Sequence, residues 1–243
     1  MEKEKIHGRI HSVETFGASD GPGVRYIVFF QGCPLRCLYC HNPDTWDKNG
    51  GKEVSAKEVA AEISGYINYI KSGGVTLSGG EPLFQPEFAL ELIRECKKIG
   101  LHTAIDTSGA VPLKNAKPVI DECDMLLLDL KGASESLCKT ITGQSNKNML
   151  EILNYCESIK KRVWIRHVLV KGYTLKEDEL ELAAKTLSKF SCIEKVEFLP
   201  FHKLGEFKWE QLNIPFTLKN LDTPDPEDIE KAKEIFAKYD IKF

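Results

Sequence analysis

The chain has 243 residues, a formal net charge of −3 at pH 7 and a pI near 6.1. This charge balance gives no overall basic field, so tight nonspecific binding to nucleic acid or to an acidic membrane surface is not expected. Residues 1–5 lack the apolar core of a secretion signal, and no apolar run reaches the roughly twenty residues that span a bilayer, so we expect a cytoplasmic protein with no membrane partner.

Six apolar, β-rich runs alternate with helical patterns along the chain. The predicted strands cover residues 25–31, 74–78, 102–106, 125–129, 163–170 and 195–199. The predicted helices cover residues 55–71, 87–98, 115–123, 148–160, 176–189 and 226–239. Strands that alternate with helices are typical of a parallel sheet. We therefore predict an α/β fold, a partial (β/α)6 TIM-like barrel formed by residues 1–243 as a single domain. The closing segment, about residues 203–243, begins as a loop rich in prolines and aromatics.

Three cysteines follow the first predicted strand. Cys33, Cys37 and Cys40 are spaced as CxxxCxxC in a loop that we place at residues 31–46. A structural zinc site and a four-iron cluster normally take four protein ligands, so three thiols leave one metal position open for a substrate or cofactor. A zinc site completed by His41 or by a remote residue remains the alternative on spacing alone. Buried free thiols explain the other five cysteines better than disulfides: Cys96, Cys123, Cys138, Cys156 and Cys192.

Polar residues follow or end the predicted strands, and the carboxyl ends of barrel strands are where barrel enzymes build active sites. Gly79 and Gly80 allow a ligand to approach the backbone closely, and nearby carbonyls with the Glu81 carboxylate suit an ammonium group. A plain turn, with Glu81 bracing the loop, is the alternative. Asp106 ends its strand, and considered alone it is more typical of an aspartate that caps the next turn than of a ligand-binding residue.

The cysteine spacing and its flanks resemble a known family. The triad, with Tyr39 before its last cysteine, resembles the cluster motif of the radical S-adenosylmethionine (radical SAM) superfamily. Residues 12–25, which include Asp20-Gly-Pro-Gly23, and residues 40–46 resemble the glycyl-radical-enzyme activating family within it, and the likeness runs from residue 8 to about 209. Other activases carry a ferredoxin-like insertion with more cysteines, which is absent between Cys40 and Cys96, so the pyruvate formate-lyase type fits best.

The resemblance implies one 4Fe4S cluster held by the three cysteines, with S-adenosylmethionine on the open iron. A reduced cluster would cleave this cofactor to a 5′-deoxyadenosyl radical, which takes a hydrogen atom from the glycyl loop of pyruvate formate-lyase. A flavodoxin or ferredoxin is implied as electron donor. The open alternatives are an activase of another glycyl radical enzyme, a radical SAM enzyme acting on a small molecule, and a noncatalytic zinc-binding barrel.

The same resemblance assigns roles to individual residues, none of them a side-chain acid or base. Asp106 and Thr107 are implied at a monovalent cation, and Asp20, Gly21 and Gly23 at the docking of the partner peptide. Ordinary packing of Tyr39, an ion pair between Asp129 and Lys131, a simple hydrogen-bonded role for His202 and a plain turn at residues 20–23 remain alternatives. The implied contacts to S-adenosylmethionine are Tyr39, Cys40, His41, Gly79, Gly80, Glu81, Asp106, Asp129, Leu130, Lys131, Arg166, Val168 and His202.

Overall fold

The computed structural model describes residues 6–243, and contacts within the chain divide it into two compact units. The first unit contains the chain up to Pro34 and Thr45–Leu127, and the second contains Leu35–Asp44 and Leu128–Phe243. The cysteine loop therefore contributes to both units, with Cys33 in the first and Cys37 and Cys40 in the second. The sequence-based assessment of residues 1–5 lies outside the described residues.

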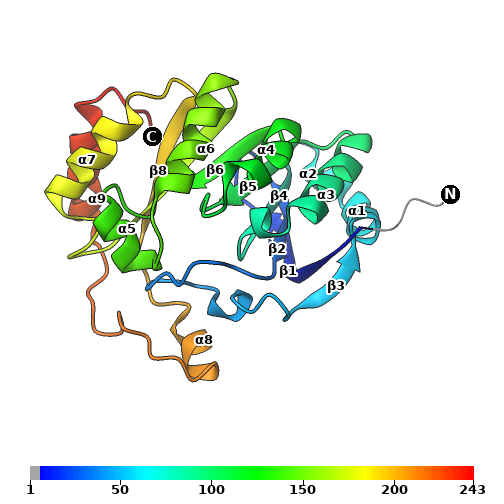
Figure 1. The fold of residues 1–243 in the computed structure, drawn as a ribbon, viewed down its shortest axis with the longest axis horizontal. Helices are drawn as coiled ribbons and strands as arrows, with labels where there is room; N and C mark the ends of the chain where they lie inside the picture. The colour runs from blue at the N-terminus through cyan, green and yellow to red at the C-terminus, as the bar shows by residue number, and fades with distance from the viewer. Residues whose placement is uncertain (1–5) are drawn as a thin grey trace. The chain divides into compact units, whose positions relative to one another are not determined.

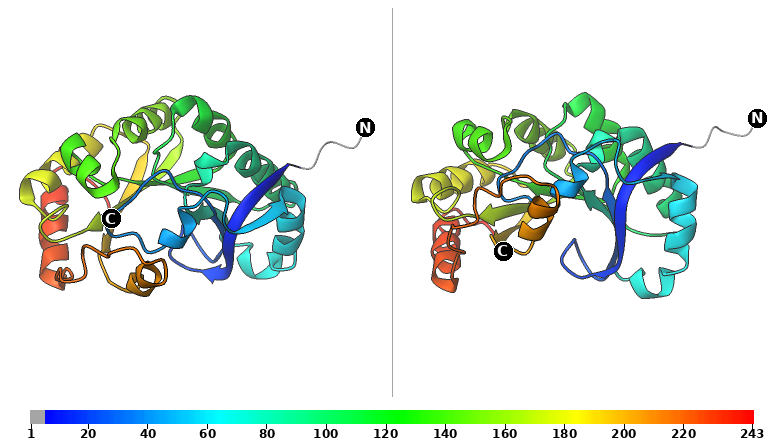
Figure 2. Two further views of the ribbon diagram at one scale, coloured as in Figure 1. Left: turned by 60° about the horizontal axis from the view of Figure 1, so that its bottom comes forward. Right: turned by 90° about the horizontal axis from the view of Figure 1, so that it is seen from below.

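The strands of the first unit are parallel at its centre and antiparallel at its edge (Figures 1 and 2). Strands β2, β4 and β5 pair in parallel, whereas β1 pairs antiparallel with both β2 and β3. Their bounds are β1 (His7–Gly17), β2 (Arg25–Phe30), β3 (Lys52–Ser55), β4 (Gly74–Gly79) and β5 (Thr103–Thr107).

Helices α1, α3 and α4 of the first unit lie side by side against its strands (Figure 1). Ser55 and Glu58 form a capping box at the start of α1, which fits the predicted helix start. The prediction of one helix over residues 55–71 is wrong, because α1 ends at Ser64 with Gly65 as its cap and a separate short helix follows. The bounds are α1 (Ala56–Ser64), α2 (Ile67–Ile70), α3 (Pro86–Lys98) and α4 (Leu113–Glu122), with short 3-10 turns η1 (Pro43–Thr45) and η2 (Pro82–Phe84).

In the second unit, strands β7 and β8 pair in parallel, with Arg166 opposite Glu197. Strand β6 crosses the boundary between the units at Leu127 and Leu128. The bounds are β6 (Met125–Asp129), β7 (Arg162–Leu169) and β8 (Ile193–Pro200), with α5 (Glu135–Thr142), α6 (Lys147–Ser158), α7 (Glu177–Leu187), α8 (Glu206–Gln211) and α9 (Pro226–Ala237).

The strand order is β3-β1-β2-β4-β5-β6-β7-β8 in an open, mostly parallel sheet. The predicted α/β fold class of a partial TIM-like barrel is confirmed, and all six predicted strands are present. Strands β1 and β3 were missed, as were helices α5 and α8. Among the helices of residues 6–243, none combines the length and apolar character that a membrane crossing requires.

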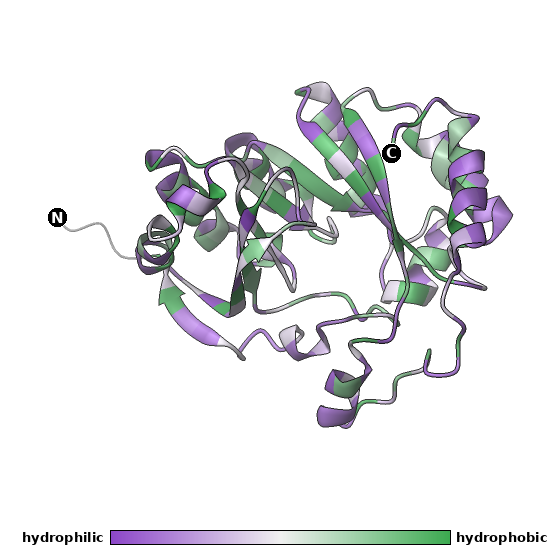
Figure 3. Cartoon of the chain, turned by 180° about the vertical axis from the view of Figure 1, so that it is seen from behind, coloured by the Kyte–Doolittle hydropathy of each residue, from purple (hydrophilic) through white to green (hydrophobic). Residues whose placement is uncertain are grey.

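Figure 3 colours the central strands largely as hydrophobic, whereas the helices mix hydrophobic and hydrophilic residues. Four consecutive residues of β6, Met125 to Leu128, are fully buried, as expected for a strand covered on both faces. The five scattered cysteines are buried thiols, which confirms the prediction of buried thiols instead of disulfides.

Candidate functional site

The first unit brings its predicted site residues together at the carboxyl ends of β2, β4 and β5. The Gly80 N–H donates to the Phe30 carbonyl at 2.9 Å, and the Glu81 N–H donates to the Gly32 carbonyl at 2.9 Å. The loop after β4 is thereby joined to the backbone directly before Cys33. Asp106 and Thr107 end β5 on the same edge.

Glu81 is fully buried and links the loops after β4 and β5. One carboxylate oxygen accepts from the Leu83 N–H at 3.1 Å and the Thr107 hydroxyl at 2.6 Å, and the other accepts from the Ser108 N–H at 3.0 Å and the Ser108 hydroxyl. Burial raises the pKa of Glu81, against the opposing effect of the Ser108 and Thr107 hydrogen bonds. Glu81 therefore braces the loop, as the alternative interpretation held.

Gly79 and Gly80 lack side chains for a reason that the neighbouring strand supplies. A Cβ on Gly79 would lie 2.4 Å from the Phe30 nitrogen, and one on Gly80 would lie 2.4 Å from the Gly32 carbonyl oxygen. Gly79 also has a φ of +103°, which residues with a Cβ rarely adopt. The close approach of β2 therefore requires both glycines, whether or not a ligand also uses their carbonyls.

We expect Gly79→Ala to lower the free energy of unfolding much more than Gly100→Ala. Both glycines have positive φ, +103° and +78°, but nothing lies within 4 Å of a Cβ on Gly100. Gly100→Ala should therefore cost only the backbone strain, roughly 1 kcal/mol. Gly79→Ala adds a clash with Phe30 that should cost about 1–3 kcal/mol more. Urea unfolding of both variants measures the difference, and equal losses would contradict the packing explanation.

Asp106 and Thr107 differ in how far the protein already uses their side chains. Asp106 Oδ2 accepts from the Ser78 hydroxyl at 2.7 Å, and the residue is half-buried at the strand edge. The Thr107 hydroxyl donates to Glu81 at 2.6 Å and accepts from the Gly109 N–H at 2.9 Å. The Thr107 hydroxyl therefore uses its proton and one of its two lone pairs within the protein, and the Asp106 carboxylate uses Oδ2.

The turn at residues 20–23 precedes β2, and buried polar side chains bind its backbone carbonyls. The Thr76 hydroxyl donates to the Asp20 carbonyl at 2.6 Å, and the fully buried Arg25 donates to the Pro22 carbonyl at 3.1 Å. Gly21 and Gly23 have φ values of +119° and +73°, as a tight turn requires. Thr76 and Ser78 share one face of β4, about 7 Å apart, so the turn and Asp106 lie along the same face.

In the second unit, the cysteine loop packs on helix α5. The N–H groups of Arg36 and Leu38 donate to the carbonyls of Thr142 and Ile141, both at 2.9 Å, and the Cys40 N–H closes a turn on the Cys37 carbonyl at 3.1 Å. Helix α5, which sequence reasoning missed, thus supports the loop.

Among residues 6–243, no three His, Cys, Asp or Glu side chains converge closely enough to hold one metal ion. A site for a single metal ion such as zinc requires that all of its ligands meet at one point. A four-iron cluster imposes a looser condition, because each thiolate binds a different iron and the sulfurs need not meet at one point.

Tyr39, Asp129 and Lys131 form a buried polar group behind the cysteine loop. Asp129 and Lys131 form an ion pair at 2.6 Å, and the Lys131 ammonium lies 5.8 Å from the centre of the Tyr39 ring. Burial acts to lower the pKa of Lys131, but the Asp129 carboxylate prevails and the pKa lies well above its usual value. The Tyr39 hydroxyl is buried and has no hydrogen-bond partner in the described part of the chain. Such an orphaned group fits a site completed by a ligand.

His41 and His202 contact each other directly. Their rings stack with centroids 4.0 Å apart, and His41 Nε2 lies 3.1 Å from the His202 carbonyl oxygen. Burial lowers the pKa of His41. Two stacked imidazole rings make a flat surface that suits a nucleobase.

Leu130, Arg166 and Val168 are positioned by the neighbouring strands. The Leu130 N–H donates to the Arg166 carbonyl at 2.9 Å, and the Leu130 carbonyl lies 2.6 Å from His167 Nδ1. The Arg166 guanidinium lies 3.9 Å from the Glu197 carboxylate. Arg166 and Val168 share a face of β7 and lie within the strand, not beyond its end.

The buried histidine of β7 should make stability depend on pH. Burial lowers the pKa of His167, and this effect outweighs the hydrogen bond to the Leu130 carbonyl and the Glu179 charge, which raise it; Lys131 lowers it slightly further. Between this lowered value and the ordinary 6.5, only the unfolded chain gains a proton, so stability falls as pH falls through that window. His41 acts in the same direction.

His167→Asn keeps a donor near the Leu130 carbonyl but does not titrate, so its free energy of unfolding should depend less steeply on pH below 6.5. Urea unfolding between about pH 5 and 8 compares the two slopes. Identical slopes would show that His167 does not titrate in this range.

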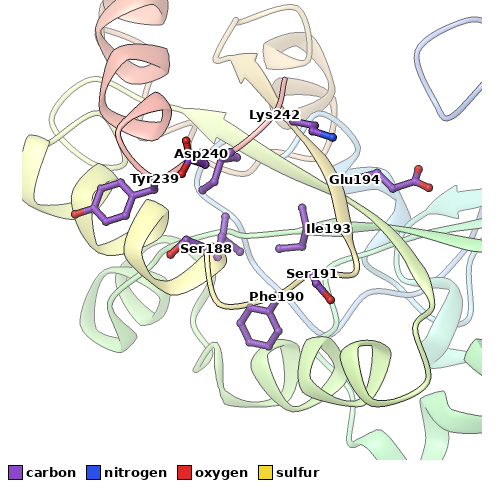
Figure 4. A pocket seen from close by; sticks show the side chains of 10 residues that line it. Ser188, Phe190, Ser191, Ile193, Glu194, Tyr239, Asp240 and Lys242 are labelled. Atoms are coloured by element: carbon purple, nitrogen blue, oxygen red, sulfur yellow. The ribbon is translucent and has the colours of Figure 1, made fainter.

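A cavity of about 500 Å³ lies elsewhere, at the start of β8 (Figure 4). Its lining includes Ser191, Ile193, Glu194, Asp240 and Lys242, and none of the predicted site residues. Because β8 begins there, the cavity is at the opposite end of that strand from His202.

Two residues that sequence reasoning did not single out bind the cysteine loop. The Trp209 indole N–H donates to the Cys40 carbonyl at 2.8 Å, and the Lys208 ammonium donates to Asn42 Oδ1 at 2.8 Å. The only signal in the sequence was an aromatic residue and a lysine in a segment expected to be a loop.

The sequence profile of the Radical SAM superfamily matches residues 27–183. The pyruvate formate-lyase-activating enzyme of Clostridium pasteurianum is 42% identical over 231 residues, which cover 94% of this chain and 97% of that protein. The pyruvate formate-lyase 1-activating enzyme of Escherichia coli K12 is 42% identical over 240 residues, which cover 96% of this chain and 97% of that protein.

Solved structures of related proteins share the fold of this chain. A domain of a pyruvate-formate lyase-activating enzyme from Bacteroides vulgatus aligns with a TM-score of 0.59 at 27% identity, over 70% of this chain and 96% of that chain. A radical SAM methyltransferase from Sphaerobacter thermophilus aligns with a TM-score of 0.65 over 90% of this chain and 65% of that chain. At 18% identity, the second likeness shows a shared fold alone.

Proposed function

Because the chain belongs to the radical SAM superfamily and, within it, to the pyruvate formate-lyase-activating enzymes, we propose that it installs a glycyl radical on a pyruvate formate-lyase. The observation that carries this proposal is the 42% identity over nearly the full length of both chains. The three-cysteine motif and the polar strand ends support it.

The family implies a 4Fe4S cluster and S-adenosylmethionine, and the residues present fit both groups. In the proposal, Cys33, Cys37 and Cys40 hold the cluster. The cluster and S-adenosylmethionine supply the one-electron chemistry and the carbon radical that no side chain provides. The Tyr39 hydroxyl has no hydrogen-bond partner among the described residues, whereas the Glu81 carboxylate is fully hydrogen-bonded. This difference supports a cofactor-binding role for Tyr39 and a role for Glu81 in holding the loops.

The chain's own residues have the task of binding and orienting. The carbonyls of Gly79 and Gly80 and the Asp106 carboxylate suit the ammonium end of the cofactor, or a monovalent cation beside it. Asp129 suits a ribose hydroxyl. Lys131, which is paired with Asp129, also suits the carboxylate of the cofactor. His41 and His202 offer a stacking surface for the adenine. Leu130, Arg166 and Val168 complete the proposed contacts along β6 and β7.

The partner's glycyl loop is the proposed substrate, and Asp20, Gly21 and Gly23 are the proposed docking residues. Their turn lies along the same face of β4 as Ser78 and Asp106, which supports a peptide that runs toward the cofactor. A flavodoxin or ferredoxin as electron donor, a cytoplasmic location and a single domain over residues 1–243 belong to the same proposal.

Reconstitution under anaerobic conditions tests the proposal. The protein is incubated with a reductant, S-adenosylmethionine and either pyruvate formate-lyase or a class III ribonucleotide reductase, and electron paramagnetic resonance (EPR) is recorded. A glycyl radical doublet on pyruvate formate-lyase alone supports the proposal, and a doublet only on the reductase assigns another partner. Metal analysis addresses the zinc-binding barrel: about four irons and four sulfides per chain exclude it, whereas one zinc without sulfide would establish it.

A further inference from the structure

A segment of the C-terminal region binds the loop that follows the third cysteine. We call residues 202–209 the strap; it runs from His202 into helix α8, which lies beside that loop in Figure 2. The Trp209 indole N–H donates to the Cys40 carbonyl at 2.8 Å. The Lys208 ammonium donates to Asn42 Oδ1 at 2.8 Å and pairs with the Asp44 carboxylate at 3.0 Å.

The other end of the strap packs against the loop backbone. A Cβ on Gly205 would lie 2.8 Å from His41 Cα, so only glycine allows this approach. His202 supplies the stacked ring and the carbonyl that lies 3.1 Å from His41 Nε2. Cys40, His41, Asn42 and Asp44 thus each contact the strap.

These contacts are sheltered from solvent. Trp209 is 5% exposed and packs against Phe216, with ring centroids 5.3 Å apart. The side chains of Lys208 and Asp44 are 20% and 28% exposed. A partly buried ion pair and a buried indole hydrogen bond define a conformation more firmly than exposed contacts do.

The position of the Cys40 carbonyl matters because of peptide planarity. The Cys40 carbonyl and the His41 N–H belong to one planar peptide group. A hydrogen bond to the carbonyl oxygen holds the orientation of this group and so restricts the ψ angle of Cys40, which relates the Cys40 side chain to His41. Because Asn42 precedes Pro43, its backbone is restricted to extended conformations. The backbone between His41 and Asp44 therefore has few conformations open to it.

We propose that Trp209 and Lys208 are positioning residues for the iron-sulfur cluster. By holding the chain on the C-terminal side of Cys40, they set the direction of its thiolate and of the neighbouring His41 ring. This inference rests on the proposed function only in requiring that Cys40 binds a cluster. It adds two residues, about 170 positions away in the sequence, that act through the ligand's backbone.

Two pairs of matched variants test the proposal. Trp209→Phe removes the donor and keeps the ring, and Trp164→Phe removes a comparable bond, at 2.8 Å to Glu194, on strand β7. Lys208→Met removes the loop ion pair, and Lys171→Met removes pairs to Asp225 and Asp228 at 3.1 and 2.8 Å. Thermal unfolding of each variant reports the general loss of stability.

The readouts are the EPR spectrum of the reduced cluster, its midpoint potential and the rate at which a chelator removes iron. We expect Trp209→Phe and Lys208→Met to alter the spectrum and potential and to lose iron roughly 10-fold faster, as is typical when a partner outside the metal's own ligands is removed. Lys208→Arg should restore the wild-type spectrum at least in part, since it keeps the ion pair. The Trp164 and Lys171 variants should match the wild type.

If the strap variants keep the wild-type spectrum, potential and iron-loss rate while their melting temperatures fall like those of the controls, the strap only stabilises the fold and the inference is wrong. The two failures can be told apart. A wild-type protein without any four-iron signal refutes the proposed function, whereas a normal wild-type cluster with unchanged variants refutes the strap alone.

Discussion

Cys37→Ala, purified without oxygen, is expected to contain little iron and sulfide and to cleave S-adenosylmethionine more than roughly 100-fold more slowly than the wild type. The estimate is a lower bound, because losing a partner outside a metal's ligand shell already costs 10- to 100-fold and Cys37 is a proposed ligand. Two thiolates cannot hold the cluster that three hold with one corner open. Iron and sulfide analysis and the yield of 5′-deoxyadenosine are the measurements.

Cys192→Ala is the matched control. Cys192 is 7% exposed and Cys37 is 8% exposed, so both substitutions remove a buried sulfur of similar accessibility. Cys192 lies directly before β8 and outside the motif. We expect this variant to retain about four irons and wild-type cleavage. A normal cluster in Cys37→Ala would contradict the ligand assignment, and equal loss in both variants would point to a general effect of removing a buried thiol.

The parallel strands were predictable because each is a short apolar run between polar turns, and Met125 to Leu128 is the clearest example. Strand β1 was not, since polar residues such as Arg9 and Glu14 interrupt its apolar ones and it contains no continuous apolar run. Helix α8 is short and half-polar, and its helical form is tied to contacts of Trp209 and Lys208 that are distant in sequence. Local pattern carries little information about such elements.

At the candidate site, residue types were predictable but their duties were not. Both an amine-binding and a bracing role were consistent with Glu81 after Gly79-Gly80, and only the positions of Thr107 and Ser108 show that its carboxylate holds the two loops together. The ion pair between Asp129 and Lys131, one of the alternatives that the sequence left open, is present in the structure. The roles of such residues depend on contacts between segments that are distant in the sequence, which residue spacing does not predict.

Glu81→Ala is expected to lower the free energy of unfolding by about 3 kcal/mol or more. It removes the acceptor of four hydrogen bonds and leaves the N–H groups of Leu83 and Ser108 without it in a buried site, where each unsatisfied group costs about 1–3 kcal/mol. Glu157→Ala is the control, because Glu157 also accepts from several donors, including the Cys192 N–H at 2.8 Å, but lies at the surface. That substitution should cost much less than Glu81→Ala, because water can satisfy the exposed donors.

Glu81→Gln separates the need for an acceptor from the need for bulk. One carboxylate oxygen faces Leu83 and Thr107 and the other faces Ser108, so a glutamine must turn its NH₂ group toward one of these sets of donors. We expect it to remain destabilised by about 1–3 kcal/mol, although its shape is nearly that of glutamate. Urea unfolding measures the loss, and binding of S-adenosylmethionine by the reconstituted protein measures whether the Gly79-Gly80 loop moves with it. Wild-type stability in Glu81→Gln would show that the carboxylate is not the brace, because only an acceptor on both sides satisfies both loops.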